Sequence, residues 1–544
     1  MKASELFIRC LENENVDYLF GIPGEENLDL MDALLDSKIQ FITTRHEQGA
    51  AFMADVHGRL TGKAGVCLAT LGPGATNLIT GVADGNMDLA PMVAIAGQAA
   101  TTRLHKESHQ VLNLVEMFKP ISKYSTQVLE PTIIPEIIRK AFKVAESEKP
   151  GCSFIDLPEN IAAMDAADKI PLKVQRALAP VPAEEKIQQA AKLIAAAKNP
   201  IIMAGNGVIR AHASDELVRF AQKLNIPVAT TFMAKGVIPF SDPLCLGTVG
   251  LQAHDYVSCG FDRADVILCI GFDMVEYHPY LWHKEKNKKI IHIAETSAEV
   301  DEFYILECGV IGQIKIALQE IAKNVPDANQ QDMSHLRRVI VAEMNEHATD
   351  NSFPVKPQKL VWDLRQALKN EDILISDVGA HKMWIARMYQ AEAPNTCLIS
   401  NGFASMGMSV PGCIAAKLLY PHKTVVAMTG DAGFLMNSQE IETAMRIGTP
   451  FIIIIWNDQH YGLIEWKQQI HFGRESHVSF TNPDFVKYAE SFGAKGYRIG
   501  STNQLIPTIK QAIADNTVVI IDCPVDYSEN MKLTEKLGKN RCII

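Results

Sequence analysis

The sequence predicts an α/β protein made of three doubly wound parallel-sheet domains. Short apolar, β-branched runs alternate with longer segments of helical period, and two proline-bearing breaks divide the chain into thirds. Continuous apolar strands separated by helices are typical of parallel sheets that are covered on both faces. The expected strands are residues 65–70, 92–96, 200–203, 266–270, 289–293, 373–376, 424–428, 450–456 and 518–522.

The two breaks set the expected domain boundaries. Residues 171–186 carry three prolines, and residues 346–357 are polar and then proline-bearing. Both stretches have the composition of linkers. We therefore expect domains at residues 1–170, 185–345 and 355–544, each of ordinary domain size.

Composition narrows the classes of function. Of the 544 residues, 47% are hydrophobic and 21% are charged, and the formal net charge is −11. This acidic balance disfavours nucleic acid and anionic membranes as partners. The longest apolar run, residues 451–456, is far shorter than the run of about 20 residues that a membrane helix needs.

The amino terminus and the cysteines indicate a cytoplasmic protein. Residues 1–16 lack the apolar core and the small-residue cleavage site of a signal peptide. The 11 cysteines are scattered and are never spaced as Cys-x-x-Cys. We therefore expect reduced thiols, without a disulfide framework or a zinc site.

The stretch from residue 424 to residue 462 is the most informative part of the chain. Its first expected strand ends at Gly430-Asp431, and its second ends at Asn457-Asp458. A strand–helix–strand crossover makes the two strands parallel, so both end at the sheet edge where open α/β sheets bind ligands. Oxygen ligands that converge there suit Mg²⁺ and leave positions for diphosphate oxygens.

The crossover between these strands offers a cradle for phosphate. Gly430 and Gly433 let the backbone approach phosphates closely, and a helix start supplies free N–H groups. Asn437 or Ser438 is expected to cap the amphipathic helix that follows. A lone Asp after a strand is most often a turn residue or a cap, so the paired spacing carries the metal prediction.

This stretch resembles the thiamine-diphosphate fingerprint, Gly-Asp-Gly followed one crossover later by Asn-Asn. The resemblance implies that Asp431 and Asp458 are side-chain ligands of Mg²⁺ and that His460 gives its main-chain carbonyl. Ala432 and Asp458 depart from the usual Gly and Asn, and a register shifted by one residue would make Asn457 the ligand. The implied cofactor contacts here are Gly430, Asp431, Ala432, Gly433, Asp458, His460, Tyr461 and Gly462.

The first third of the chain resembles the pyrimidine-binding (PYR) domain of the same family. Glu47, in Arg45-His46-Glu47, matches the glutamate that bonds the aminopyrimidine, and Pro73 and Asn77 match positions beside that ring. The implied role of Glu47 is catalytic, because its carboxyl group favours the imino form of the ring, whose nitrogen then removes the thiazolium proton. Without its flanking pattern, this triplet would be a solvated turn.

The last third resembles the diphosphate-binding (PP) domain, and the middle third resembles the family's central domain. Residues 377–381 match a segment that touches the diphosphate, and residues 400–407 match a loop beside the aminopyrimidine. Met406 matches the apolar wedge that bends the cofactor, although a methionine also fills gaps in cores. The implied contacts are Val378, Gly379, Ala380, His381, Gly402 and Met406.

Over its whole length the chain resembles the acetolactate synthases, and their catabolic, flavin-free branch more than the biosynthetic branch. Gln110 matches an active-site contact in a His-Gln pair, and residues 271–279 with Trp282 resemble the catabolic central domain. Thiamine diphosphate and Mg²⁺ are the implied cofactors, and FAD is not expected. The family builds its sites between two chains, so the resemblance implies a homodimer or a homotetramer.

The implied reaction decarboxylates pyruvate, a 2-keto acid, and transfers the two-carbon unit to a second pyruvate to give 2-acetolactate. The alternatives are a non-ligating 2-keto-acid decarboxylase, a carboligase with another acceptor, and a catalytically silent cofactor-binding paralogue. Two departures leave the substrate open. Glu25-Glu26 stands where catabolic members have a lysine, and Lys467 stands at a substrate-sizing position, with Trp466 one place earlier.

Overall fold

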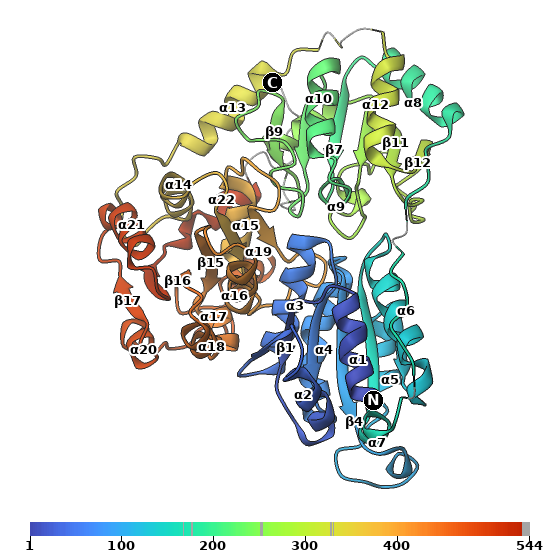
Figure 1. The fold of residues 1–544 in the computed structure, drawn as a ribbon. Coiled ribbons are helices and arrows are strands. Elements are labelled where there is room, and N and C mark those ends of the chain that lie inside the picture. Colours follow the sequence, from blue (N-terminus) through green and yellow to red (C-terminus); the bar gives the residue numbers. More distant parts are fainter. Residues whose placement is uncertain (167, 176–177, 251–253, 327–328, 330, 536–544) are drawn as a thin grey trace.

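Three parallel β-sheets, each with helices packed against it, make up the chain (Figure 1). The structure is a computed structural model and describes residues 1–166, 168–175, 178–250, 254–326, 329 and 331–535. Each sheet has six strands, and all pairings within the three sheets are parallel. The predicted fold class is therefore confirmed. The domain boundaries at residues 1–170, 185–345 and 355–544 stay a proposal.

The first sheet has the strand order β2-β1-β3-β4-β6-β5. Its strands are β1 (Tyr18–Gly21), β2 (Gln40–Thr43), β3 (Gly65–Ala69), β4 (Met92–Gln98), β5 (Tyr124–Gln127) and β6 (Cys152–Pro158). Its helices are α1 (Ala3–Asn13), α2 (Leu28–Leu34), α3 (Glu47–Thr61), α4 (Pro73–Met87), α5 (Leu114–Phe118), α6 (Ile134–Glu146) and α7 (Glu159–Ala163).

The central sheet has the order β12-β11-β10-β7-β8-β9. Its strands are β7 (Pro200–Ala204), β8 (Val228–Thr230), β9 (Cys245–Thr248), β10 (Val266–Ile270), β11 (Lys289–Ala294) and β12 (Leu306–Ile311). The helices of this part are α8 (Glu184–Ala196), α9 (Gly207–Arg210), α10 (Ser214–Leu224), α11 (Tyr256–Arg263), α12 (Ile314–Asn324) and α13 (Ser334–Asn345).

The third sheet, β14-β13-β15-β16-β18-β17, repeats the topology of the first. Its strands are β13 (Ile373–Ser376), β14 (Cys397–Ile399), β15 (Val425–Gly430), β16 (Ile452–Asn457), β17 (Lys495–Arg498) and β18 (Val519–Pro524). Its helices are α14 (Pro357–Ala367), α15 (Ala380–Met388), α16 (Ser409–Leu419), α17 (Asp431–Asn437), α18 (Glu440–Ile447), α19 (Gly462–Phe472), α20 (Phe485–Ser491), α21 (Leu505–Asp515) and α22 (Asn530–Glu535).

All nine strands expected from the sequence are present. They are β3, β4, β7, β10, β11, β13, β15, β16 and β18. The strands that the sequence did not reveal include the edge strands β2, β5 and β17, whose residues are mostly half-buried or exposed. Such strands mix polar and apolar residues, so they lack the continuous apolar signal of a strand buried on both faces.

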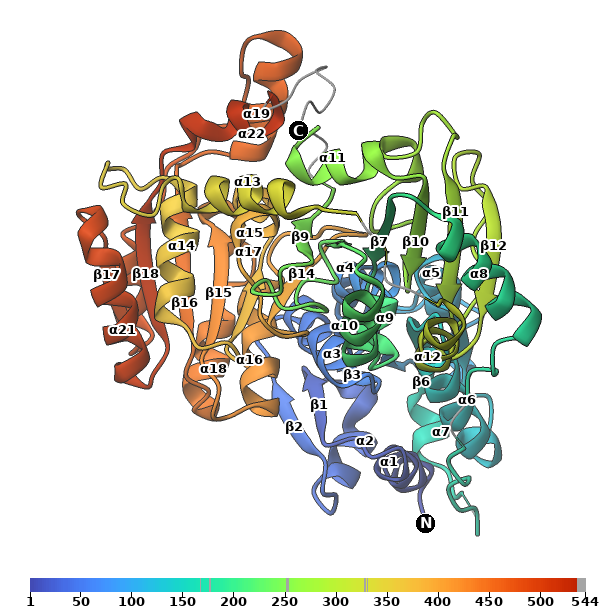
Figure 2. The same ribbon diagram turned by 90° about the horizontal axis from the view of Figure 1, so that it is seen from above.

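The first and third domains pack directly against each other through α3 and α16, which lie side by side in Figures 1 and 2. One apolar cluster runs through this contact and includes Val56 of α3 and Val410 of α16. A Cβ on Gly412 would lie 2.8 Å from Val56 Cγ2. Glycine therefore permits the close approach of the two helices, which fixes the PYR-like and PP-like parts of one chain relative to each other.

The expected helix cap is wrong. The amphipathic helix expected after Asn437 or Ser438 is α18, but its N-cap is Gln439, and Asn437 instead donates from its side-chain amide to Gly407 O at 3.0 Å. Nine cysteines among the described residues are buried free thiols.

Within the described part of the chain, no helix combines the length and the apolar character needed to cross a membrane.

Candidate functional site

The carboxyl ends of β13, β15 and β16 bring three aspartates to one edge of the third sheet. Asp377 follows β13, Asp431 follows β15 and begins α17, and Asp458 follows β16. Because β13 pairs with β15 and β15 pairs with β16, all in parallel, the three loops are neighbours. This edge includes the β13/β15 switch point, where open α/β sheets bind their ligands.

Asp431 holds the loops of this edge together. Its Oδ2 accepts hydrogen bonds from the main-chain N–H of Gln459 and the side-chain amide of Asn482, both at 2.7 Å. Its Oδ1 accepts from the N–H of Ala432 at 2.9 Å. Asp431 is buried, and burial raises its pKa. The loop after β16 is thereby tied to the start of α17.

Asp458 lies close enough to Asp431 for the two carboxylates to repel each other. Burial and the charge of Asp431 raise the pKa of Asp458 to about 7. Two carboxylates that penalise each other's ionisation form a pair that a divalent cation stabilises. The chemistry of this donor set therefore fits Mg²⁺.

Asn457 has other partners. Its side-chain amide donates to Asp522 Oδ1 at 2.8 Å, and its oxygen accepts from Asn482 at 3.1 Å. Of the two registers that the sequence left open, this arrangement favours Asp458 as the ligand. His460 follows at once, and its Nδ1–H donates to the main-chain oxygen of Asp458 at 2.8 Å.

Asp377 organises the other side of this edge; the sequence placed it in the diphosphate segment but gave it no role of its own. Its Oδ1 accepts from the N–H groups of Val378 and Gly407, both at 2.8 Å. Its Oδ2 accepts from the hydroxyls of Ser409 at 3.2 Å and Thr429 at 3.1 Å. One buried carboxylate thus joins the 377–381 loop to the loop that carries Met406.

His381 and Gly462 bear on whether a diphosphate fits here. Burial lowers the pKa of His381 to about 3, and its Nε2 is buried without a hydrogen-bond partner among the described residues. A Cβ on Gly462 would lie 2.6 Å from Asp458 Oδ2, so a side chain there would crowd the carboxylate. The unpartnered imidazole nitrogen could bond a phosphate oxygen, and the glycine leaves room beside the Asp458 carboxylate, so these residues fit the cofactor.

A cavity of about 520 Å³ opens beside this edge. Among the predicted residues, Asp458, His460 and Gly462 line it, together with Trp466. Trp466 is 4% exposed and packs into the core, whereas Lys467 is exposed. Tyr461, another predicted contact, is 41% exposed.

The predicted pyrimidine end lies at the start of α3. Glu47 is the first residue of α3 and is 9% exposed. The amide of Asn77, in the second turn of α4, donates to Glu47 Oε2 at 2.9 Å. A Cβ on Gly74 would lie 3.4 Å from Glu47 Oε1, so the start of α4 leaves space beside that oxygen. The structure therefore brings Glu47 and Asn77 together, with Pro73 at the start of α4.

Glu440, at the start of α18, positions the residues before Glu47. Its Oε1 accepts from the N–H groups of Arg45 at 3.1 Å and His46 at 3.0 Å. Its Oε2 accepts from the hydroxyl of Thr443 at 2.7 Å. The carboxylate is buried and belongs to the third domain, so it fixes the start of α3 from across the domain contact. No spacing in the sequence reveals this contact.

Gln110 lies over the turn that precedes α4. Gly72 has a positive φ of 54°, and a Cβ there would be 2.9 Å from Gln110 Cβ. Gln110 itself has a φ of 59° and is exposed. The predicted substrate contact is therefore next to Pro73, on the same side as the pyrimidine residues.

The 400–406 loop contacts the far end of α4. The N–H of Gly402 donates to Asp88 Oδ1, and the N–H of Asn401 donates to Asp88 Oδ2 at 3.0 Å. The eleven-residue step from Asn77 to Asp88 along α4 corresponds to roughly 16 Å at 1.5 Å per residue. Within one chain, Glu47 and Gly402 are thus separated by far more than the width of one pyrimidine ring.

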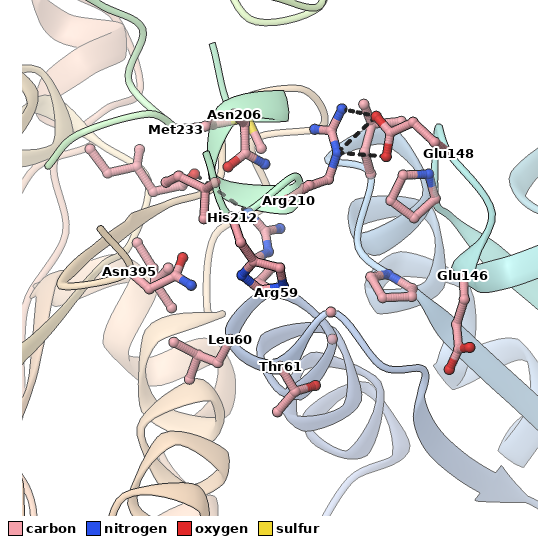
Figure 3. Close-up of a pocket in the computed structure, with 18 residues that line it drawn as sticks. Arg59, Leu60, Thr61, Glu146, Glu148, Asn206, Arg210, His212, Met233 and Asn395 are labelled. Atoms are coloured by element: carbon pink, nitrogen blue, oxygen red, sulfur yellow. Dashed lines mark hydrogen bonds and ion pairs between the residues drawn. The ribbon is translucent and has the colours of Figure 1, made fainter. Parts of the chain in front are cut away.

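A smaller cavity lies where the three domains meet (Figure 3). It has a volume of about 100 Å³ and is lined by residues such as Arg59, Asn206 and Arg210. Arg210 is paired there with Glu148, as the dashed lines show. None of the residues predicted for the site lines this cavity, and its charged groups already have partners.

In the central domain a buried carboxyl group, that of Glu276, fills the sheet edge at the ends of β7 and β8. The carboxylate of Glu276 accepts from the N–H of Asn206, at 3.0 and 3.1 Å, and from the hydroxyl of Thr231. These groups lie at the ends of β7 and β8, beside the β7/β10 switch point. Burial and Asp273 raise the pKa of Glu276 to about 8. A carboxyl group therefore stands where such folds hold a cofactor phosphate.

Comparison with known proteins agrees with this architecture. Residues 1–117 match the N-terminal TPP binding domain of the thiamine pyrophosphate enzymes, residues 187–321 match their central domain, and residues 377–523 match their C-terminal TPP binding domain. The fold and the three domains are thus those of a thiamine pyrophosphate enzyme.

The chain is 35% identical to an acetolactate synthase of Bacillus subtilis over 99% of its own length and 96% of that protein. It is 36% identical to a probable acetolactate synthase large subunit of Methanocaldococcus jannaschii, over 99% and 94% of the two chains. A catabolic acetolactate synthase of Raoultella terrigena is 34% identical, over 98% and 97%. The protein belongs to the acetolactate synthase family.

Proposed function

We propose that this protein condenses two molecules of pyruvate to 2-acetolactate and carbon dioxide, with thiamine diphosphate and Mg²⁺ as cofactors. One observation carries the proposal: a chain of this family holds acidic residues suited to both ends of the cofactor. Asn77 holds Glu47 at the pyrimidine end, and Asp431 and Asp458 converge at the diphosphate end. The bound cofactor supplies the nucleophile and the electron sink.

The chain's own residues bind, orient and move protons. Glu47 shares a proton with the ring nitrogen of the aminopyrimidine, and Gln110 faces the substrate. Asp431, Asp458 and the carbonyl of His460 hold Mg²⁺. The remaining proposed contacts are Pro73, Asn77, Val378, Gly379, Ala380, His381, Gly402, Met406, Gly430, Ala432, Gly433, Tyr461 and Gly462.

We propose that each site is built from two chains, in a homodimer or a homotetramer. The separation of roughly 16 Å along α4 between the Glu47 and Gly402 contacts supports this, because both residues are assigned to one ring. Exposed apolar residues in and beside the loop also support it, since such residues gather at interfaces. They are Met87, Phe403, Leu435 and Met436, each between 39% and 47% exposed, with Met87 near Gly402 and Met436 near Gly407.

We also propose that the central domain holds no FAD. The Glu276 carboxylate, bonded to Asn206 N–H and Thr231, supports this because it takes the place of a cofactor phosphate. A cytoplasmic location stays a proposal that rests on the sequence.

Product analysis tests the function. The purified protein is incubated with pyruvate, thiamine diphosphate and Mg²⁺, and the products are identified directly. We expect one 2-acetolactate and one carbon dioxide for every two pyruvates consumed. Acetaldehyde in place of acetolactate would identify a simple decarboxylase. The proposal would also be overturned if ligation required an added second carbonyl compound, or if pyruvate were not turned over at all.

A further inference from the structure

A buried ionic cluster lies at the contact between the first and third domains. The Arg59 guanidinium pairs with Asp55 at 2.8 Å, with Asp84 at 3.1 Å and with Asp88 at 2.8 Å. The side chains of all three aspartates are 0% exposed, and that of Arg59 is 7% exposed. A single guanidinium thus faces three carboxylates away from solvent, an arrangement that needs further donors.

The further donors come from the 400–405 loop of the third domain. Asp84 Oδ1 accepts from the hydroxyl of Ser400 at 2.8 Å and from the N–H of Ser405 at 3.1 Å. Asp88 accepts from the N–H groups of Asn401 and Gly402, one on each carboxylate oxygen. The two carboxylates therefore accept hydrogen bonds from both ends of the loop. Three of the four bonds come from backbone N–H groups.

The electrostatics explain why the loop is held firmly. Burial and the charges of Asp88 and Asp55 raise the pKa of Asp84. Each N–H that points at these oxygens offsets part of that cost, and hydrogen bonds to buried charges are the strong ones. Lys382 of α15, whose pKa burial lowers to about 8, adds a second cation near Asp88 and Asp84.

We propose that Asp84 and Asp88 are positioning residues for the cofactor. They fix the loop that presents Gly402 and Met406, and so they set the affinity for thiamine diphosphate. The inference rests on the proposed function only in assigning those two residues to the cofactor. The carboxylates act through the loop and touch no reacting atom.

Asp55 provides a matched control. It shares the Arg59 guanidinium and the same burial, and its side chain hydrogen-bonds Arg59 within α3 and Asp84, but it makes no bond to the loop. Asp55→Asn therefore perturbs the ionic cluster and leaves the loop's acceptors in place. Asp88→Asn is nearly isosteric, yet it replaces one carboxylate oxygen with an NH2 donor, which then faces the N–H of either Asn401 or Gly402.

The test compares Asp88→Asn, Asp84→Asn and Asp55→Asn as purified full-length enzymes. Calorimetry with Mg²⁺ and without pyruvate measures thiamine diphosphate binding, and thermal unfolding measures stability. We expect the Asp88 and Asp84 variants to bind the cofactor at least about tenfold more weakly than wild type, with Asp55→Asn within about twofold. The inference would be overturned if all three variants bound the cofactor as tightly as wild type, or if all three lost affinity to the same extent.

A second variant covers the case in which Asp88→Asn does not fold. Ser400→Ala removes one bond to Asp84 and leaves every charge in place, and we expect cofactor binding to weaken about threefold. Unchanged affinity would count against the proposal. Because binding is measured without substrate, a wild-type enzyme that binds the cofactor but makes no acetolactate would refute the proposed function alone.

Discussion

Asn77 donates a 2.9 Å hydrogen bond to one carboxylate oxygen of Glu47 and leaves the other oxygen beside Gly74. The bond fixes the rotation of the carboxyl group, so its second oxygen has a defined direction. In the proposed function, that oxygen meets the ring nitrogen of the aminopyrimidine. Asn77 thus orients the group on which proton transfer depends.

Replacing Glu47 with Gln should lower acetolactate production at least about a hundredfold, because an amide cannot share a proton with the ring. The fold should persist, since the change is nearly isosteric. Steady-state rates with saturating cofactor measure the effect, and Glu5→Gln on the exposed face of α1 is the control. Retention of more than about a tenth of wild-type activity would contradict the role of Glu47.

Removal of divalent ions should abolish activity, and Mg²⁺ should restore it. Asp458→Asn should raise the Mg²⁺ concentration for half-maximal activity by about ten- to a hundredfold, because one charged ligand is lost. Asn457→Ser tests the alternative register and should change the Mg²⁺ requirement much less. A larger effect at Asn457 than at Asp458 would move the ligand by one residue.

Mixing two inactive variants should restore activity if each site uses two chains. Glu47→Gln and Asp431→Ala, coexpressed with different tags, should give roughly a quarter of wild-type activity, because heterodimers then contain one intact site in two. Each variant alone should be inactive. Coexpression of wild type with the double variant is the control and should also give about a quarter. No recovery in the first mixture would place both halves in one chain.

The purified protein should carry no flavin. Glu276 already bonds the N–H of Asn206 that a cofactor phosphate would use, so added FAD should be lost on desalting. Visible absorbance before and after incubation with FAD measures this, and acetolactate production should be independent of FAD. A yellow protein with a stoichiometric flavin would contradict the proposal.

Glu440 should make stability depend on pH. Burial raises its pKa to about 7, so the folded state retains a proton that the unfolded state releases near pH 4.5. The stabilisation that this retained proton gives to the folded state is fully present below about pH 4.5 and is lost as the pH rises through about 7. Between pH 5 and pH 8, the unfolding free energy of the wild type should therefore fall by about 2 to 3 kcal/mol more than that of Glu440→Gln. Chemical denaturation at each pH measures these free energies. An equal dependence on pH in the two proteins would exclude this titration.

The strands buried on both faces could be predicted from the sequence, because their residues are apolar without interruption. The convergence of Asp431 and Asp458 could be predicted as well, since parallel strands end at one edge. The cap of α18 could not. The sequence suggested Asn437 or Ser438, but the N-cap is Gln439 and the Asn437 amide bonds Gly407 instead, so tertiary contacts overrode the local preference.

Contacts between domains were beyond sequence reasoning. Glu440 reaches Arg45, and Asp88 reaches Gly402, across separations of 395 and 314 residues. Each of these acids looks like an ordinary helix residue in its own segment. Their functions depend on how α3, α4 and the third domain pack, which no local pattern encodes.

The shared strand order of the first and third sheets has a consequence for ancestry. One topological plan occurs at both ends of the chain, with the proposed ring-contacting loops in one copy and the proposed ion-binding loops in the other. Such a pair is what duplication followed by divergence would produce. A symmetric assembly of two chains would then surround its two cofactors with four versions of one ancestral unit.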